Sequence, residues 1–276
     1  MPTTIDGLTI FGAIEAKWKS LGGLQSPLRR PVSNETPTFD QVGRYQNFQG
    51  GIISWLPQTG AHVVWGSIGG RWLQIGREKF GYPITDETST GDGRGRFNHF
   101  RAFKSDGTFI GESSIFWLAE IGAHEIYGGI REKWASMDWD RSSLGYPTGA
   151  ERDRTEGVGR EQRFQHGRLV WSGATGALFE PAPTPTIKLF PIREDGNYLK
   201  VKGINFTPDQ TVQLNWSYST EDAPDLTNFG DHSTISDEIG SFTYPIPVGF
   251  DIATAAAQAT DIASGVSARR EFPPSN

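Results

Sequence analysis

Three short stretches of the chain open the same pattern of apolar and polar positions. From the first isoleucine in "FGAIEAKW", "WGSIGGRW" and "YGGIREKW", apolar residues stand at positions i, i+4 and i+7. This spacing is typical of the buried face of a short helix. We therefore predict three short helices, each beginning near its glycine. Their apolar faces consist of Ile14, Trp18 and Leu21, of Ile68, Trp72 and Ile75, and of Ile130, Trp134 and Met137.

A hairpin pattern follows each predicted helix, after a turn that contains proline. The turns read "LQSP", "FGYP" and "LGYP". Beyond each turn, Gly-Arg stands five residues before a phenylalanine, and a tryptophan stands five residues before Gly-Ala. The middle copy is ten residues longer between these anchors, and its Asp106-Gly107 is typical of the tip of a longer hairpin. The phenylalanines are Phe48, Phe100 and Phe164, and the tryptophans are Trp55, Trp117 and Trp171.

The helix and the hairpin together form a repeating unit that cannot bury its own apolar surface. Such units must pack against one another. We predict a mainly β fold with short helices, in which copies at about 8–62, 63–124 and 125–180 close into a small propeller- or trefoil-like domain. In that arrangement the N-terminal "GLTIF" completes the last copy. An open, short solenoid is the alternative.

The pattern changes at the end of the predicted repeat domain, 1–180. Alternating prolines in 181–186 predict an extended linker. In 187–276 the apolar residues alternate with a period of two, as in Val212 and Leu214. Short strands separated by turn signals, such as "DGN" at 195–197, predict an antiparallel β-sandwich.

The composition argues against several classes of function. Lys and Arg number 26 and Asp and Glu number 32, so the net charge of −6 disfavours binding to nucleic acid. Without cysteine the chain has neither disulfides nor thiolate chemistry. No apolar stretch reaches about 18 residues, so we expect no insertion into a membrane. The N-terminal "MPTTIDGLTI" lacks the pattern of a signal peptide.

No motif in the sequence predicts a catalytic or metal site. The five histidines include no pair at the spacing of metal ligands, and neither G-x-S-x-G nor S-x-x-K occurs. We therefore expect a protein that is not an enzyme and that binds no metal or cofactor. A hydrolase with two distant carboxylates remains an alternative, because such pairs assemble only in the folded chain.

An acidic residue stands four positions before the arginine of each Gly-Arg. Two roles fit this spacing. The acid and the arginine can form an ion pair that fixes the hairpin, or the arginine can read a sugar hydroxyl or a carboxylate. The pairs are Asp40 with Arg44, Asp92 with Arg96, and Glu156 with Arg160.

Histidine follows Gly-Ala in two of the three copies, as His62 and His124. Leu178 takes this place in the third copy, which argues against a symmetric metal site of three histidines. A structural hydrogen bond and a contact to a ligand both fit the two histidines.

The hairpin tryptophans also allow two interpretations. Apolar neighbours in "GIISW" and "RLVW" favour an inward orientation in the core. Sugar recognition, however, needs a flat apolar ring surrounded by polar side chains, which tryptophan supplies. Clefts between successive copies would bring tryptophan, arginine and histidine together.

The three copies resemble the LGFP repeat, which is named for a Leu-Gly-Phe-Pro turn. That turn stands as "FGYP" at 80–83 and "LGYP" at 144–147, and in altered form as "LQSP" at 24–27. The helix, the hairpin Phe, the Trp and the "GAH" also match, over roughly residues 8–180. The later "LKVKGINFTPDQTVQL" is similar to Ig-like modules of secreted bacterial proteins.

The LGFP family occurs mostly in actinobacterial envelope proteins, often attached to mycolyltransferases or peptidoglycan amidases, where it is thought to hold the protein on cell-wall glycan. The resemblance implies an extracellular or cell-wall-associated protein. It also adds the turn tyrosines to the residues of interest.

These observations favour a non-catalytic protein that binds a polysaccharide or glycoconjugate of a cell envelope in clefts between aromatic-rich repeats. Several weak sites engaged together would supply avidity. The alternative is a structural or protein-interaction scaffold that binds no sugar. The predicted binding residues are Trp55, Trp117, Trp171, His62, His124, Arg44, Arg96, Arg160, Tyr82 and Tyr146.

Overall fold

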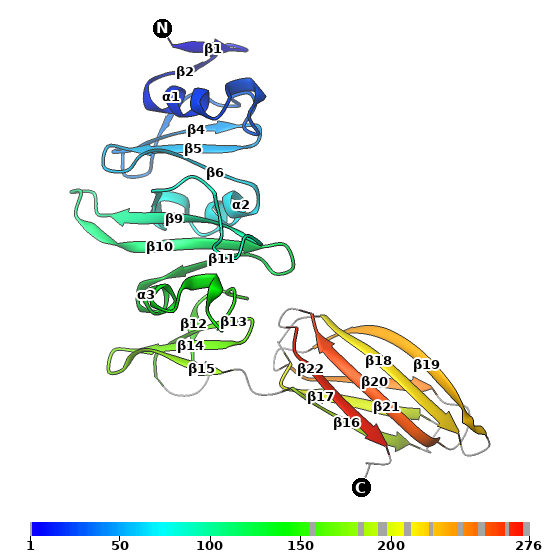
Figure 1. Cartoon of the computed structure of the whole chain (residues 1–276). Coiled ribbons are helices and arrows are strands. Elements are labelled where there is room, and N and C mark those ends of the chain that lie inside the picture. The colour runs from blue at the N-terminus through cyan, green and yellow to red at the C-terminus, as the bar shows by residue number, and fades with distance from the viewer. Residues whose placement is uncertain are drawn as a thin grey trace. The chain divides into compact units, whose positions relative to one another are not determined.

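The computed structural model of the chain contains two compact units (Figure 1). They span Met1–Glu180 and Pro181–Asn276. The structure describes residues 2–154, 158–181, 185–192, 198–206, 211–220, 223–236, 240–247, 252–262 and 265–272.

The first unit contains the three predicted helices, and each one begins at the predicted glycine. These glycines have φ values of +60°, +54° and +56°, a left-handed conformation that favours glycine. The predicted Ile and Trp of each apolar face are buried, whereas the third member of each face is half-buried. A short 3-10 turn follows each helix. The helices are α1 (Gly12–Ser20), α2 (Gly66–Gln74) and α3 (Gly128–Ser136), and the turns are η1 (Gly23–Gln25), η2 (Arg77–Lys79) and η3 (Trp139–Arg141).

Four antiparallel sheets accompany these helices in the first unit. A two-stranded sheet precedes α1, and one larger sheet follows each helix as the predicted hairpin plus a third long strand. The strands of the four sheets are β1 (Thr3–Ile5) and β2 (Leu8–Ile10); β3 (Thr36–Pro37), β4 (Arg44–Phe48), β5 (Gly51–Leu56) and β6 (Gly60–Trp65); β7 (Tyr82–Pro83), β8 (Thr88–Ser89), β9 (Arg96–Phe103), β10 (Phe109–Leu118) and β11 (Gly122–Tyr127); and β12 (Arg152–Asp153), β13 (Arg160–Phe164), β14 (Gly167–Ser172) and β15 (Gly176–Pro181).

Helices and sheets alternate along the first unit, as the blue-to-green part of Figure 1 shows. In the first large sheet, Ile53 packs into the core that contains Trp18 of α1. Its neighbour Ile52 points to the other face and packs into the core that contains Trp72 of α2. The sheet of the first repeat is therefore buried on both faces, between its own helix and the next one.

The second large sheet has the same arrangement. Ile115 packs with Trp72 of α2, and the adjacent Phe116 packs with Trp134 of α3. Each helix after the first thus joins two sheets, and the repeats stack in a line.

The prediction of a closed propeller or trefoil is wrong. In the residues that the structure describes, β2 pairs with β1 rather than with the last sheet, and β15 pairs with β14. The physical reason is that the two faces of each sheet pack against successive helices, so one copy follows another by stacking. The open arrangement, which was the alternative, is the one observed.

The last sheet differs on the face where a fourth helix would pack. Glu161 occupies the position that Tyr45 and Phe97 hold in the preceding sheets, where those rings pack against the next core. The Glu161 carboxylate accepts hydrogen bonds from Arg152 at 2.7 Å and from Arg168 at 2.9 Å. A polar outer face of this kind is what a terminal repeat needs to end a stack.

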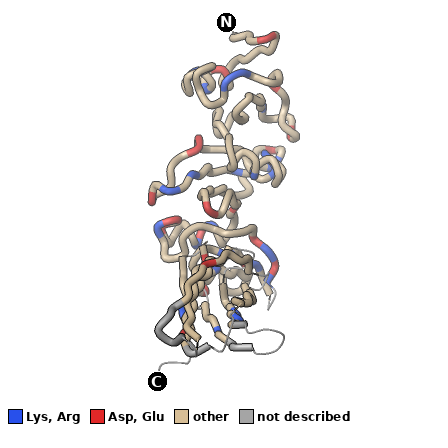
Figure 2. The backbone as a smooth tube through the Cα atoms, turned by 90° about the vertical axis from the view of Figure 1, so that its right-hand side faces the viewer, with Lys and Arg blue, Asp and Glu red and all other residues tan. Residues whose placement is uncertain are grey.

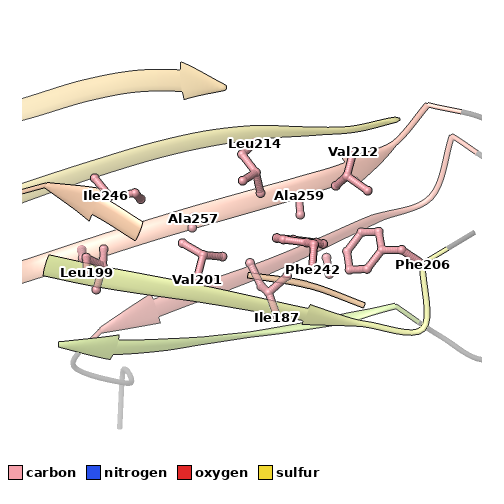
Figure 3. Packing of buried hydrophobic residues seen from close by; sticks show 12 residues of the cluster. Ile187, Leu199, Val201, Phe206, Val212, Leu214, Phe242, Ile246, Ala257 and Ala259 are labelled. Atoms are coloured by element: carbon pink, nitrogen blue, oxygen red, sulfur yellow. The ribbon is translucent and has the colours of Figure 1, made fainter. Parts of the chain in front are cut away.

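The second unit consists of two antiparallel sheets that share one core, shown in Figure 3. The predicted alternation is confirmed, because Val212 and Leu214 are buried on one face of their strand. The turn predicted at 195–197 and the middle of the predicted linker, 182–184, lie outside the described residues. The strands are β16 (Thr186–Ile192), β17 (Tyr198–Ile204) and β20 (Phe242–Pro247) in one sheet, and β19 (Ala223–Ile235), β18 (Thr211–Thr220), β21 (Ile252–Asp261) and β22 (Ser267–Phe272) in the other.

Candidate functional site

The predicted arginines and hairpin tryptophans are direct neighbours across the strands of each hairpin. Residues directly opposite each other in an antiparallel pair share one face of the sheet. In the first two repeats the next strand adds an alanine opposite the tryptophan. We call this set of cross-strand neighbours the Arg–Trp row. The pairs are Arg44 with Trp55, Arg96 with Trp117, and Arg160 with Trp171.

The three indoles of the rows differ in exposure. Trp55 and Trp117 are half-buried and pack against the cores of the first and second repeats. Trp171 is 38% exposed, so it offers the largest indole surface of the three. Its ring lies against the start of α3, where a Cβ atom on Gly129 would come within 2.6 Å of it. Trp55 and Trp117 therefore pack mainly toward the core, whereas Trp171 presents part of its ring at the surface.

Among the residues that the structure describes, Asp40 and Asp92 do not form the predicted ion pairs with Arg44 and Arg96. In the described part of the chain, Asp40 and Asp92 bond to tyrosines, and Glu156 lies outside that part. The arginines instead approach a glutamate nine residues earlier. The N···O distances are 3.8 Å for Arg44–Glu35, 3.9 Å for Arg96–Glu87 and 2.9 Å for Arg160–Glu151.

The turn tyrosines Tyr82 and Tyr146 join successive repeats. Both are 1% exposed, so no ring face is open to a ligand, contrary to their place among the predicted binding residues. The Tyr82 hydroxyl donates to Asp40 at 2.8 Å, and the Tyr146 hydroxyl donates to Asp92 at 2.6 Å. Each bond runs from the turn of one repeat to a loop of the repeat before it.

These contacts lower the pKa values of the two aspartates and raise those of the tyrosines. Burial opposes ionisation of Asp40 and Asp92, but hydrogen bonds that include the tyrosine hydroxyl outweigh it and bring each carboxyl pKa below its usual value. Burial is also the main cause that raises the pKa of each tyrosine. At each joint a neutral tyrosine hydroxyl therefore donates a charge-assisted hydrogen bond to a carboxylate.

The same joints help to explain the glycines of the first two Gly-Arg pairs, where the carbonyl oxygen of the row tryptophan also lies close. A Cβ atom on Gly43 would lie 2.6 Å from the ring of Tyr82, and one on Gly95 would lie 2.8 Å from the ring of Tyr146. Glycine is required here by the close approach of the tyrosine ring.

The histidines His62 and His124 lie on the opposite face from the Arg–Trp row. Each follows the alanine of the row, and successive side chains of a strand point to opposite faces. His62 Nε2 lies 3.0 Å from the carbonyl oxygen of Thr59, and His124 Nε2 lies 2.9 Å from that of Ile121. A carbonyl only accepts, so each Nε2 carries the proton. The structural interpretation of the histidines fits this geometry, and the structure does not bring them into the row.

Two shallow hollows flank the row of the second repeat. The first has a volume of about 600 Å³ and contains Arg96, Glu87 and Trp65. Burial raises the pKa of Glu87, although a hydrogen bond from the Trp65 side chain and the charge of Arg96 oppose that shift. The second hollow, of about 480 Å³, lies beside Arg71 of α2 and includes Ala123 and His124. Trp117 stands between Arg96 and Ala123 across the sheet.

Charged residues of both signs lie along the first unit, as Figure 2 shows. Among the described residues, no group of three or more His, Cys, Asp or Glu could hold a metal ion. No helix within them is long and apolar enough to cross a membrane.

The alternating helices, hairpins and tyrosine joints agree with the comparison with known families. The model of the LGFP repeat matches residues 30–79, 80–142 and 144–179. No family model identifies the second unit, so its similarity to Ig-like modules stays a prediction. No curated protein matches the chain. The three matches cover more than half of the chain, which therefore belongs to the LGFP-repeat family.

Proposed function

We propose that this protein is a non-catalytic carbohydrate-binding protein of a cell envelope, and that it binds polysaccharide at its Arg–Trp rows. The observation that carries the proposal is the cross-strand Arg–Trp pair, which recurs at the same place in each of three sheets. An indole offers a flat apolar surface to the C–H face of a sugar ring. The neighbouring guanidinium supplies N–H donors in a fixed fork for hydroxyl or carboxylate oxygens.

The rows fit weak binding at several points better than tight binding at one. The arginine side chains of the rows are 39%, 45% and 35% exposed, and the hollows beside the second row are shallow. A long polymer that contacts several rows at once gains avidity without a deep pocket. A polysaccharide has the repeating structure that such an array can use.

The test is retention of the purified full-length protein on insoluble cell-wall polysaccharide. Trp171→Ala removes the most exposed indole of the rows, so retention should fall by about twofold to tenfold if stacking on a sugar supplies about 0.5–1.5 kcal/mol, the range for an aromatic pair. Phe109→Ala is the matched control, because Phe109 is an aromatic residue outside the rows and is 54% exposed. Absence of retention for the wild type, or equal loss in both variants, would overturn the proposal.

A second candidate function is a protein-interaction scaffold. It is supported by the tip of the β9–β10 hairpin, where Phe109 and Ile110 are 54% and 61% exposed. Exposed apolar residues that lie together mark protein contacts. If this function is the correct one, replacing both residues by aspartate abolishes capture of a defined envelope protein, whereas Trp171→Ala leaves that capture intact.

A further inference from the structure

The arginines of the second and third rows are neutralised to different extents. Arg160 forms ion pairs with Glu151 at 2.9 Å and with Asp153 at 2.7 Å. Arg96 lies 3.9 Å from Glu87, and the position that corresponds to Asp153 is Ser89. Two carboxylates therefore hold the arginine of the third row, whereas one more distant carboxylate faces that of the second.

The guanidinium of Arg96 keeps donors that the protein does not use fully. Its Nη1 donates to the hydroxyl of Ser89 and, at 3.4 Å, to the carbonyl of Gly95. The distance of 3.9 Å between Arg96 Nε and Glu87 Oε1 exceeds the usual length of a charged hydrogen bond. An arginine has five N–H donors, and within the described part of the chain the others have no hydrogen-bond acceptor.

The hollow beside Arg96 has a volume of about 600 Å³ and is lined by charged, aromatic and polar residues. Its lining combines the Arg96 guanidinium with the indole of Trp65, the hydroxyl of Ser89 and the open start of α2 at Gly66. A Cβ atom on Gly66 would have no atom within 4 Å, so space lies in front of this backbone. The one acidic group in the lining is Glu87, whose side chain is 18% exposed compared with 45% for Arg96. The more accessible charge in the hollow is therefore positive.

We propose that the hollow beside Arg96 is an anion subsite, which takes a carboxylate or phosphate group carried by a sugar, and that the third row lacks this preference because Asp153 occupies its arginine. The proposal rests on the proposed function and adds the ligand class of one row. Carboxylated and phosphorylated glycans share the chemistry that a guanidinium recognises, a planar or tetrahedral group of oxygen acceptors with negative charge.

The experiment is an NMR titration of the full-length protein with three probes at low ionic strength. The probes are an oligogalacturonide, its methyl ester and glucose 1-phosphate. The ester has the same sugar chain, but a methyl group replaces the negative charge of each carboxyl group. Because Arg96 is partly exposed, we expect the acid to bind about fivefold more tightly than the ester, a factor that salt reduces. Binding of the phosphate probe shows whether phosphorylated sugars share the site.

Two substitutions locate the effect. Ser89→Asp copies Asp153 of the third repeat and should remove the preference for the acid over the ester. Arg96→Gln should also remove the preference by removing the charge, and it should weaken binding of the ester as well, because the guanidinium donates to hydroxyl oxygens too. Thr88→Asp is the matched control, since it adds the same charge one residue away on the opposite face of β8 and should keep most of the preference.

Each outcome decides a different statement. Equal affinities of the wild type for acid and ester overturn the anion subsite and leave the proposed function in place. A preference for the acid that persists in Ser89→Asp and Arg96→Gln overturns the assignment to this hollow. Failure of all three probes overturns the subsite. The proposed function is tested separately, by the retention of the wild type and of the Trp171→Ala and Phe109→Ala variants on cell-wall polysaccharide.

Discussion

The sheets of the second and third repeats follow one template but differ in their surroundings. In the second sheet, Ile115 and Phe116 pack into two different cores, so both faces are buried. In the third, one face packs on α3 and the other carries the Glu161–Arg168 ion pair at 2.9 Å. The comparison shows that the neighbour stacked on a sheet, as well as the repeat motif, determines what each position does.

The rows of the same two sheets differ in a related way. The second row has a half-buried Trp117 and an incompletely paired Arg96, whereas the third has a more exposed Trp171 and a fully paired Arg160. Repeats with one fold thus present different surfaces at corresponding positions. The predictions below test this comparison, beginning with the largest expected effect.

The helix tryptophans should dominate the stability of the stack. Trp134 is fully buried and packs on both Phe116 and Phe164, which belong to successive sheets. Trp134→Ala should lower the free energy of unfolding by about 3–5 kcal/mol, because it leaves a cavity between two repeats. Trp171→Ala, the control, should lower it by about 1 kcal/mol or less. Urea denaturation followed by circular dichroism measures both, and equal losses would contradict the assignment of core and surface.

The tyrosine joints should come next in size. Tyr82→Phe and Tyr146→Phe each remove a hydroxyl that donates to a carboxylate across a joint. Each should lower the free energy of unfolding by about 1.5–3 kcal/mol, the range for hydrogen bonds to charged groups. Tyr45→Phe is the control and should change the free energy of unfolding little. It also removes a tyrosine hydroxyl, but it keeps the ring, which lies 3.6 Å from the Arg77 guanidinium. Unchanged stability in both joint variants would refute their role.

The joint between the first two repeats should weaken in acid. Burial opposes ionisation of Asp86, but the His62 ring, whose Nδ1 lies 3.4 Å from the carboxylate, and hydrogen bonds from Lys17 and from the Val63 N–H bring its pKa well below the usual value. Since the pKa is lower in the folded than in the unfolded state, this stabilisation is present above about pH 4 and is lost as the pH falls.

Asp86→Asn tests this pH dependence. The third repeat has Ala150 at the corresponding position, so the two joints differ in this respect. Between about pH 6 and pH 2.5, the free energy of unfolding should fall more for the wild type than for the variant. The difference should be about 1 kcal/mol or less, because Asp86 is partly exposed. Parallel profiles for the two proteins would contradict the assignment.

The smallest expected effect concerns the charged partner of the third row. Asp153→Ser makes this row resemble the second, because Arg160 then keeps Glu151 alone. The unfolding midpoint should stay unchanged, while affinity for an oligogalacturonide should rise by about twofold. Thermal unfolding and NMR titration measure the two quantities, and a decrease in affinity would contradict the comparison of the rows.

The helices and hairpins could be predicted from the sequence because each has its own period of apolar residues. The helix faces at Ile68 and Trp72 and the hairpin tip at Asp106-Gly107 follow from local spacing alone. The sequence also contains a pattern that indicates stacking, which the prediction of a closed propeller or trefoil did not take into account. Consecutive apolar residues such as Ile52 and Ile53 indicate a sheet that is buried on both faces, which a stack provides.

The site was predictable only in part. The register of a hairpin with a known tip brings Arg44 opposite Trp55, so the pairing could have been derived. The partners of the acids could not, since the loop that carries Asp40 turns toward a tyrosine of the next repeat. Exposure of Trp171 depends on packing in three dimensions, to which sequence spacing is insensitive.

The most direct test of the binding surface is to follow the indole N–H signals of all nine tryptophans during a titration with cell-wall oligosaccharide. The account predicts that Trp171 shifts most, that Trp55 and Trp117 shift less, and that the buried Trp72 and Trp134 do not shift. Binding that leaves the signals of all three row tryptophans unchanged would contradict it.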